Sequence, residues 1–398
     1  MKIVYLHQYF NTDKGSTRSY EIAKYLVSQG HEVTMITGND AKSCDGIKVI
    51  STKTPYQQAF GYPRRIFSFL LYMLKSLWYC LFEREVDMIY ASSTPLTVGL
   101  VGKWAAKLKR CRFVFEVRDL WPDVPIELGI IRNKWLIRLL NNMERGIYKQ
   151  SDRIIALSSG MKDEIAAKGV SENKIDVITN FADIELFQSI NIAEQANMYV
   201  LYPELQNHFI SLYAGTIGFV NHVEYILKLA QNTVDSRILY VIVGDGKEKP
   251  RLVKEAGQLG LTNVLFLDSV SKRDAMILMT MSDVGMCFVR PHPILDRNSQ
   301  NKLFDFWAAG KPTLINYKGW QDEAMRAYEA GRGFDYEELD EMTAYIESIC
   351  HHRDNYEQLS MNTKALANCY KKETHLESLE LILQNTHSRE ELCNETST

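Results

Sequence analysis

Asn298-Ser-Gln-Asn-Lys-Leu-Phe-Asp-Phe-Trp-Ala-Ala-Gly-Lys-Pro312 is the stretch around which the rest of the chain can be organised. Asn298 and Ser299 are favoured N-cap residues, so they predict the start of a helix of about three turns, which Gly310 ends. Residues 313–316 then predict a short buried strand. The segment therefore reads as a loop, a helix and a strand.

The start of this helix is a candidate phosphate site. A helix N-terminus offers unpaired backbone N–H groups and a partial positive charge. Asn301 and Lys302 stand in the first turn, where Lys302 adds a full charge, and Asp305 lies on the same face one turn later. We expect these residues to meet a diphosphate and the hydroxyls of a ribose. A Lys–Asp pair at this spacing is, however, more often only a solvated pair.

The composition is that of a soluble globular protein. The chain has 398 residues, of which 46% are hydrophobic and 24% are charged, and this length predicts two domains of about 180 residues. The net charge of −3 gives no global attraction to nucleic acid or anionic lipid, so any basic binding site must be local. Seven scattered cysteines argue for reduced thiols in the cytoplasm, and against disulfides or a zinc site.

Both halves of the chain predict doubly wound α/β domains. A strand at 2–7, a polar loop with Gly15, a helical run at 18–29 and a strand at 32–37 form a βαβ unit, which implies a parallel sheet. The N-terminal apolar run is too short for a signal peptide. Further strands are expected at 47–51, 88–92, 112–117, 153–158, 174–179, 209–214, 238–243, 264–267 and 284–289, with helical patterns between most of them and beyond residue 339.

Residues 66–82 form an apolar run whose only charge is Lys75. A spanning helix needs about 20 apolar residues, so the run is too short and too interrupted to be favoured as one. We expect a helix that packs on the first sheet and touches the membrane with its outer side, with a fully covered helix as the alternative. The residues expected to pack inward are Phe67, Leu70, Leu71, Leu74, Trp78 and Leu81, and those expected to contact the membrane or acceptor are Arg64, Arg65, Phe69, Met73 and Leu77.

Six motifs in order resemble glycosyltransferase family 4, over roughly residues 1–385. Glu116-Val-Arg-Asp-Leu-Trp-Pro-Asp123 is similar to an element of the branch that contains bacterial surface-polysaccharide (O-antigen and capsule) sugar transferases. The other motifs are Gly15-Ser-Thr-Arg18 with Gly30-His-Glu-Val-Thr34, Ile178-Thr-Asn-Phe-Ala-Asp183, Tyr213-Ala-Gly-Thr-Ile-Gly218, Val243-Gly-Asp-Gly246 and Asn301–Pro312.

The resemblance implies the GT-B fold, in which two Rossmann-like domains face each other across a cleft. It implies an acceptor-side domain at 1–185, a nucleotide-sugar domain at 186–365, a helix at 366–385 that returns to the first domain, and a polar tail at 386–398. It also implies sugar transfer from a nucleotide-sugar, usually with retention and without a metal, and the chain has no Asp-x-Asp pair. The donor site would then include Gly15, Ser16, Gly215, Lys302 and Asp305, with Lys302 on the diphosphate.

The chain departs from the family pattern at several positions. Thr216 and Asn221 stand where many members have Arg and Lys, and the family's paired glutamates become Arg297 and Asp305. Arg297 cannot accept a hydrogen bond from a sugar hydroxyl, so the donor sugar must be read differently. The candidates to substitute are Arg290, His292, Asp296 and Asn298.

Three other features are less decisive. Asp119 follows an apolar strand, so it either caps the loop or points into the cleft toward the acceptor hydroxyl. His7 is expected to be a core or cleft-lining residue. The His351–His352 pair has no other metal-ligand types nearby, so we expect it to be solvated.

Together these features predict an enzyme that moves a sugar, of the 2-acetamido class, from a UDP-sugar to a polyprenyl-diphosphate-linked saccharide. It would act at the inner face of the cell membrane as a peripheral protein, with Lys302 and Asp119 as catalytic residues, without metal or cofactor, and without nucleic acid as a partner. The alternatives are a UDP-sugar epimerase on the same fold and a non-catalytic nucleotide-sugar-binding subunit.

Overall fold

The computed structural model describes residues 1–10, 17–54, 62–93 and 95–386, except the side chains of residues 62, 63, 65 and 66. The chain forms two compact units. Unit 1 holds Met1–Thr179 together with the segment that begins at His375, and unit 2 holds Asn180–Thr374.

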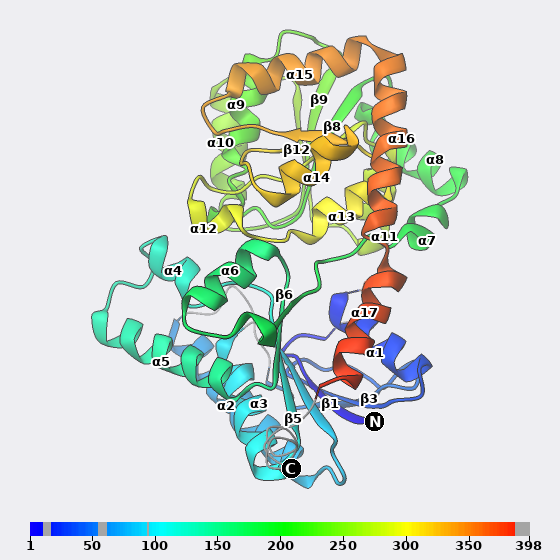
Figure 1. The fold of residues 1–398 in the computed structure, drawn as a ribbon. Coiled ribbons are helices and arrows are strands. Elements are labelled where there is room, and N and C mark those ends of the chain that lie inside the picture. Colours follow the sequence, from blue (N-terminus) through cyan, green and yellow to red (C-terminus); the bar gives the residue numbers. More distant parts are fainter. Residues whose placement is uncertain (11–16, 55–61, 94, 387–398) are drawn as a thin grey trace. The chain divides into compact units, whose positions relative to one another are not determined.

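Unit 1 is built on a sheet of seven parallel strands (Figure 1). The strands are β1 (Lys2–Leu6), β2 (Glu32–Thr37), β3 (Lys48–Ser51), β4 (Met88–Ser92), β5 (Arg112–Val117), β6 (Arg153–Ala156) and β7 (Ile175–Val177). The helices are α1 (Arg18–Ser28), α2 (Tyr62–Phe82), α3 (Leu96–Lys109), α4 (Asp123–Glu127), α5 (Lys134–Gln150), α6 (Ser159–Ala167) and most of α17 (Lys372–Gln384). The sheet order β3-β2-β1-β4-β5-β6-β7 reverses direction at β1, as a doubly wound fold requires.

Unit 2 repeats this plan with six parallel strands. The strands are β8 (Phe209–Ala214), β9 (Ile238–Val243), β10 (Val264–Leu267), β11 (Val284–Met286), β12 (Thr313–Ile315) and β13 (Gly331–Gly333). The helices are α7 (Ile184–Gln188), α8 (Ile192–Leu201), α9 (Glu224–Asn232), α10 (Lys249–Gln258), α11 (Lys272–Met281), α12 (Pro293–Asp296), α13 (Asn301–Ala308), α14 (Trp320–Tyr328), α15 (Leu339–His351) and α16 (Arg353–Cys369).

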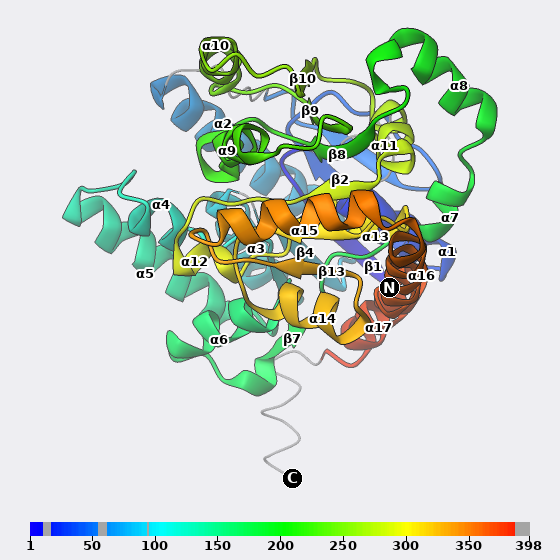
Figure 2. The same cartoon turned by 90° about the horizontal axis from the view of Figure 1, so that it is seen from above.

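The sheet of unit 2 has the order β10-β9-β8-β11-β12-β13 and carries helices on both faces (Figure 2). Helix α9 contacts α10 and α15, whereas α11 packs against α13. The prediction of two doubly wound α/β domains is confirmed. Strand β13 was not predicted, because glycine is depleted in strands and the segment Gly331-Arg-Gly333 has no apolar alternation.

The divisions between the units lie after residues 179 and 374, whereas the sequence predicts domain boundaries after residues 185 and 365. Residues just after Thr179 go with unit 2 because they bond to the end of α16 and the start of α17. The N–H of Ala182 donates to the carbonyl of Tyr370 at 2.7 Å, and Lys372 pairs with Asp183 at 2.8 Å. Within unit 1, α17 is fastened by His31 Nε2, which lies 3.1 Å from Glu380 Oε1.

Helix α2 turns to solvent the face that was expected to pack inward. Its buried side chains are Ser68, Tyr72, Ser76 and Cys80, spaced four residues apart. The exposed ones include Phe67 (66%), Leu70 (46%), Leu74 (64%), Trp78 (62%) and Leu81 (39%). Phe69, Met73 and Leu77, which were expected to face outward, are half-buried, and Arg64 is exposed. The side chain of Arg65 lies outside the described residues.

Polar contacts fix this orientation of α2. The buried Tyr72 donates its hydroxyl to the carbonyl of Ile36 in β2 at 3.1 Å, and Lys75 donates to the carbonyl of Thr52 at 2.8 Å. Buried polar groups require such partners, and the hydroxyl of Tyr72 finds its partner in β2, on the inner side of the helix. The helix is apolar all round, and its hydrophobic pattern therefore could not indicate which face is buried.

A buried ion pair joins α1 to β5 in unit 1. Arg18 Nε donates to Glu116 Oε1 at 2.7 Å, and both side chains are almost completely buried. The other guanidinium nitrogens of Arg18 donate to the carbonyls of Thr179 at 2.6 Å and Ile178 at 2.9 Å. Ser92 donates to the second oxygen of Glu116 at 2.5 Å. Arg18 thus holds three segments of unit 1 that are distant in sequence.

Candidate active site

The loops that follow β8 and β9 pack backbone against backbone. The N–H of Gly215 donates to the carbonyl of Val243 at 2.9 Å, so the ladder between the two strands continues past their ends. A Cβ on Gly244 would lie 1.9 Å from the carbonyl oxygen of Gly215, and both glycines have positive φ. A side chain at Gly244 would therefore push the two loops apart. This explains two of the glycines in the motifs without assigning them to a ligand.

Lys302 lies directly over the first of these loops. Its ammonium donates to the hydroxyl of Tyr213 at 3.0 Å and lies 4.1 Å from the centroid of that ring. The same nitrogen lies 3.4 Å from the position that a Cβ on Gly215 would take. Tyr213 in turn donates to the carbonyl of Thr216 at 2.7 Å. The lysine is therefore held at the carboxyl end of β8, where ligands bind in doubly wound sheets.

Helix α13 begins later and is shorter than predicted. It starts at Asn301 after an extended Gln300, whose side chain makes no capping hydrogen bond, and it contains eight residues. Asn298 and Ser299 do not cap it: Asn298 bonds to the carbonyl of Leu295, and the carbonyl of Ser299 accepts from Asn180 at 2.6 Å. The first turn of α13 thus lacks a side-chain cap, which leaves its N–H groups for another acceptor.

Asp305 follows Lys302 by one turn of α13. Its side chain is half-buried and accepts no hydrogen bond from the residues that the structure describes. Burial raises the pKa of its carboxyl, Lys272 lowers it, and the nearby charge of Asp183 raises it further. Asn301 is exposed at the start of the helix. Lys302, Asn301, Asp305 and Gly215 therefore gather in unit 2 as the sequence indicated, and their roles stay a prediction.

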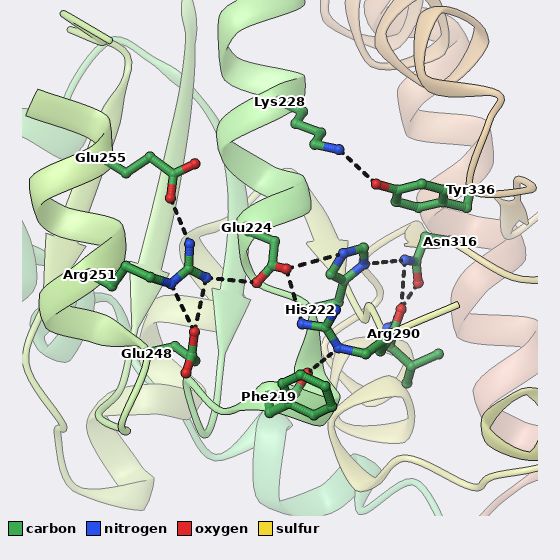
Figure 3. Close-up of polar contacts among 11 residues, drawn as sticks. Phe219, His222, Glu224, Lys228, Glu248, Arg251, Glu255, Arg290, Asn316 and Tyr336 are labelled. Atoms are coloured by element: carbon green, nitrogen blue, oxygen red, sulfur yellow. Dashed lines mark hydrogen bonds and ion pairs between the residues drawn. The ribbon is translucent and has the colours of Figure 1, made fainter. Parts of the chain in front are cut away.

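Arg290 belongs to a polar network around Glu224, the first residue of α9 (Figure 3). Its guanidinium donates to the carbonyl of Phe219 at 3.0 Å and to Glu224 at 3.0 Å, and it lies 3.8 Å from the ring centroid of Phe219. The other oxygen of Glu224 accepts from Arg251 at 3.0 Å. These contacts tie α9 and α10 to the segment after β11. They give Arg290 a structural role, and its proposed contact with the donor stays a prediction.

His222 is a member of this network that the sequence did not reveal. It is buried, has φ of +47°, and lies 3.5 Å from Glu224 through Nε2. Asn316 Nδ2 lies 3.4 Å from its Nδ1. Burial lowers the pKa of His222 to about 4, although Glu224 opposes the shift. Its neutral ring therefore acts as a spacer between β12 and α9 at ordinary pH.

Tyr213 was also missed as a functional candidate. Tyrosine at the buried end of a strand is common in cores, and only its contact with Lys302 distinguishes it.

Among the proposed substitutes for the missing glutamate, His292 accepts from the N–H of Ile294 at 3.3 Å. Burial raises the pKa of the Asp296 carboxyl to about 6, His292 lowers it, and Asp335 raises it. Asp296 is therefore mostly ionised at pH 7, where it accepts hydrogen bonds, and it gains a proton as the pH falls toward 6.

Asp119 lies in unit 1, after β5. Its side chain is exposed, and it accepts no hydrogen bond from the described part of the loop that follows. The turn is closed by its backbone instead, since the carbonyl of Asp119 accepts from the N–H of Trp121 at 2.8 Å. The loop-capping interpretation is therefore wrong for the side chain. Gly15 and Ser16, the other expected contributors from this unit, lie outside the described residues.

No group of three metal-ligand side chains occurs among the residues that the structure describes. His351 lies 3.4 Å from Asp235, and His352 lies 2.9 Å from the carbonyl of Ser348. His7 is buried, and its Nδ1 has no hydrogen-bond partner. Burial lowers the pKa of His7 to about 3, and the charge of Arg118 lowers it further.

Two sequence models match the chain in the order of its units. The model described as Glycosyltransferase Family 4 matches residues 15–186, and the model described as Glycosyl transferases group 1 matches residues 202–290. The second match includes the Tyr213–Gly218 loop on which Lys302 rests. The chain belongs to glycosyltransferase family 4.

Proteins similar to this glycosyltransferase include some that are named for colanic acid or lipopolysaccharide biosynthesis. It is 24% identical to the putative colanic acid biosynthesis glycosyl transferase WcaI of Escherichia coli K12, over 76% of this chain and 79% of that protein. Its fold matches Anabaena HepE in complex with UDP-glucose, with a TM-score of 0.74, 16% identity and 96% and 99% of the two chains covered. It also matches WaaG, a glycosyltransferase of lipopolysaccharide biosynthesis, with a TM-score of 0.68, 13% identity and coverage of 96% and 100%. The fold of this enzyme is therefore GT-B.

Proposed function

We propose that this family 4 glycosyltransferase transfers a sugar of the 2-acetamido class from a UDP-sugar to a polyprenyl-diphosphate-linked saccharide. The observation that carries the proposal is the Lys302 ammonium, held over Gly215 at the uncapped start of α13. The HepE complex with UDP-glucose supports a UDP-sugar as donor. The relatives named for colanic acid and lipopolysaccharide biosynthesis support an acceptor that is a lipid-linked saccharide.

The unit 2 residues suit the departure of UDP without a metal. As the bond between the sugar and the diphosphate breaks, negative charge grows on the diphosphate oxygens. Lys302 and the first N–H groups of α13 are donors within one helical turn, and we expect them to stabilise this charge. Asp305 accepts hydrogen bonds from the ribose hydroxyls. The expected outcome is transfer with retention of the anomeric configuration.

A product assay separates this function from its alternatives. The enzyme is incubated with a panel of UDP-sugars and a lipid diphosphate-sugar acceptor, with and without EDTA. We expect a new glycosidic bond that resists EDTA. An epimerase would convert the UDP-sugar without extending the acceptor, and a binding subunit would form no product. Activity lost in EDTA and restored by manganese would contradict the metal-free mechanism.

We expect Asp119→Asn to slow turnover and to leave the affinity for UDP almost unchanged. The exposed carboxylate lies in unit 1, whereas Lys302 lies in unit 2, and Asp119 is proposed to accept the proton of the acceptor hydroxyl. Asparagine keeps the shape without the charge. A general base contributes about 10²–10⁴-fold to a rate, so a loss in this range is expected. Calorimetry of UDP binding beside the transfer assay checks it, and a large loss of UDP affinity at unchanged turnover would remove Asp119 from the acceptor side.

The proposed membrane contact of α2 follows from its exposed apolar face. Among the described helices, none has the length and hydrophobicity to cross a bilayer. The face formed by Phe67, Leu70, Leu74 and Trp78 instead suits a helix lying at the membrane surface. These four residues replace Phe69, Met73 and Leu77 as the expected membrane contacts, because the latter three are half-buried.

Leu70→Ser/Leu74→Ser should therefore release the protein from membranes. Burying one leucine contributes about 1.5–3 kcal/mol, so the double variant should bind vesicles more than tenfold more weakly. Val200→Ser/Leu201→Ser on α8, which also removes two exposed aliphatic side chains, is the matched control. Flotation with vesicles measures both. If the control loses as much binding, or the parent protein ignores vesicles, the contact of α2 with lipid is refuted.

A further inference from the structure

Helix α5 exposes apolar side chains on a different part of unit 1. The exposed fractions of Trp135, Leu136 and Leu139 are 77%, 42% and 56%. The start of the helix is capped by Asn133, whose side chain accepts from the N–H groups of Trp135 and Leu136 at 3.0 and 3.1 Å. The exposed tryptophan therefore stands in a well-formed first turn and not in a frayed end.

The inward side of α5 is already complete. Its buried residues are Leu140, Glu144, Ile147 and Tyr148, and α5 packs against α3 and β5. Glu144 accepts from Lys168 at 2.6 Å and from Tyr148 at 2.9 Å. The packing of α5 on unit 1 therefore does not depend on Trp135, Leu136 and Leu139. Exposed aromatic and aliphatic groups side by side are typical of a binding surface.

The charge on α5 and on the helices in contact through α3 is mainly positive, although α4 before it carries Asp123 and Glu127. Helix α3 contacts both α2 and α5. These three helices hold ten basic residues and a single acidic residue, Glu144, which is buried and paired. The basic residues are Arg64, Arg65, Lys75, Lys103, Lys107, Lys109, Lys134, Arg138, Arg145 and Lys149. In a chain of net charge −3, this is the local basic site that the composition left open.

We propose that the α5 surface, defined as Lys134, Trp135, Leu136, Arg138 and Leu139, docks on the anionic surface of a lipid bilayer. Trp135 and the leucines enter the headgroup region, and Lys134 and Arg138 meet lipid phosphates. The guanidinium of Arg138 lies 5.6 Å from the centroid of the Trp135 ring, so the positive charge and the aromatic ring are adjacent on the surface. A second copy of this surface is a poor partner, because it would bring like charges together.

The inference rests on the proposed function in one respect: a lipid-linked acceptor brings the enzyme to a bilayer. It adds a second contact, separate from α2, and a requirement for lipid charge. The face of α2 is apolar and supplies attraction to any bilayer. The α5 surface combines apolar groups with cations, so its contribution should vanish on neutral lipid and weaken with salt.

Vesicle co-sedimentation of the full chain tests the proposal, without donor or acceptor. The vesicles are phosphatidylcholine with or without one quarter phosphatidylglycerol. Lys134→Gln/Arg138→Gln should lower binding to the anionic vesicles about tenfold or more and leave binding to neutral vesicles unchanged. Trp135→Ser/Leu139→Ser should weaken binding to both. The control Val253→Ser/Lys254→Gln removes one exposed aliphatic and one exposed cation from α10 and should change neither.

Three results would overturn the proposal. The first is equal binding of the parent protein to both kinds of vesicle, and the second is an equal loss of vesicle binding in the α5 variants and in the control. The third is a dimer, detected by light scattering, that Trp135→Ser/Leu139→Ser dissociates while vesicle binding persists. Circular dichroism confirms that each variant is folded. Failure here leaves the product assay untouched, because these vesicles carry no sugar. Conversely, a protein without transferase activity could still show the lipid dependence.

Discussion

Lys302→Ala is expected to abolish most sugar transfer while leaving unit 2 folded. The ammonium is half-buried, and Tyr213 is its only hydrogen-bond partner among the residues that the structure describes, so its removal leaves no unpaired charge behind. One hydrogen bond to a charged group contributes about 1.5–3 kcal/mol, which corresponds to a loss of about 10- to 150-fold in affinity for UDP or in turnover. Calorimetry with UDP and the transfer assay measure the two parts.

Two further variants define what Lys302 contributes. Tyr213→Phe keeps the ring beneath the ammonium and removes only the hydroxyl that positions it, so a smaller loss is expected. Lys254→Ala removes an exposed cation from α10 and should have no effect. If Lys302→Ala transferred sugar at the parental rate with unchanged UDP affinity, the diphosphate would have to bind elsewhere.

The strands were predictable because a parallel sheet with helices on both faces buries its strands completely. Continuous apolar runs between polar turns are therefore readable in the sequence. The predicted bounds of β2, β4, β5, β8, β9 and β10 agree with the structure. Strand β13 was not readable, because backbone pairing with β12 and not side-chain pattern holds it in place.

The buried face of a helix and the hydrogen-bond partners of a side chain were harder to predict than the helices and strands themselves. Helix α2 is apolar on every side, and its inner face is marked by Ser68, Tyr72, Ser76 and Cys80. The hydrogen bond from Tyr72 to the carbonyl of Ile36 on that face is a contact that the sequence does not show. Lys302 and Asp305 could be proposed because helical spacing places them on one face. The support of Lys302 by Tyr213 required the fold, since β8 and α13 are far apart in sequence.

The sequence carries a signal for the Arg18–Glu116 pair. A lone glutamate in the apolar strand Arg112–Val117 must find a partner, because a buried charge without one is costly. Only the fold shows that the partner is the first residue of α1. The pair also explains why Arg18, in a motif shared with the family, need not touch the donor: its nitrogens bond to Glu116 and to two carbonyls.

Arg18→Met is expected to destabilise unit 1 by about 3–5 kcal/mol, because it leaves Glu116 charged and buried. For a unit of this size, each kcal/mol lowers the unfolding temperature by about 2–4 °C. Scanning calorimetry should show the shift in the transition of unit 1 and little change in that of unit 2. Arg18→Met/Glu116→Leu, which removes both charges, should recover most of the loss, since apolar replacement of a buried pair is often neutral.

The pH dependence of the single variant distinguishes a lost ion pair from lost packing. Burial alone would raise the pKa of the Glu116 carboxyl, but Arg18, Arg118 and Ser92 together hold it below its ordinary value. A lowered pKa stabilises the parent protein above the unfolded-state pKa, and this stabilisation is lost as the pH falls through the folded-state pKa. In Arg18→Met the main opposing charge is gone, so burial should raise the pKa of the carboxyl and favour its protonated form. The stability gap between the variant and the parent should therefore narrow as the pH falls from 7 toward 4. A gap that stays constant over this range, or a double variant no more stable than the single one, would show that Arg18 stabilises unit 1 by packing and by its carbonyl bonds and not through Glu116.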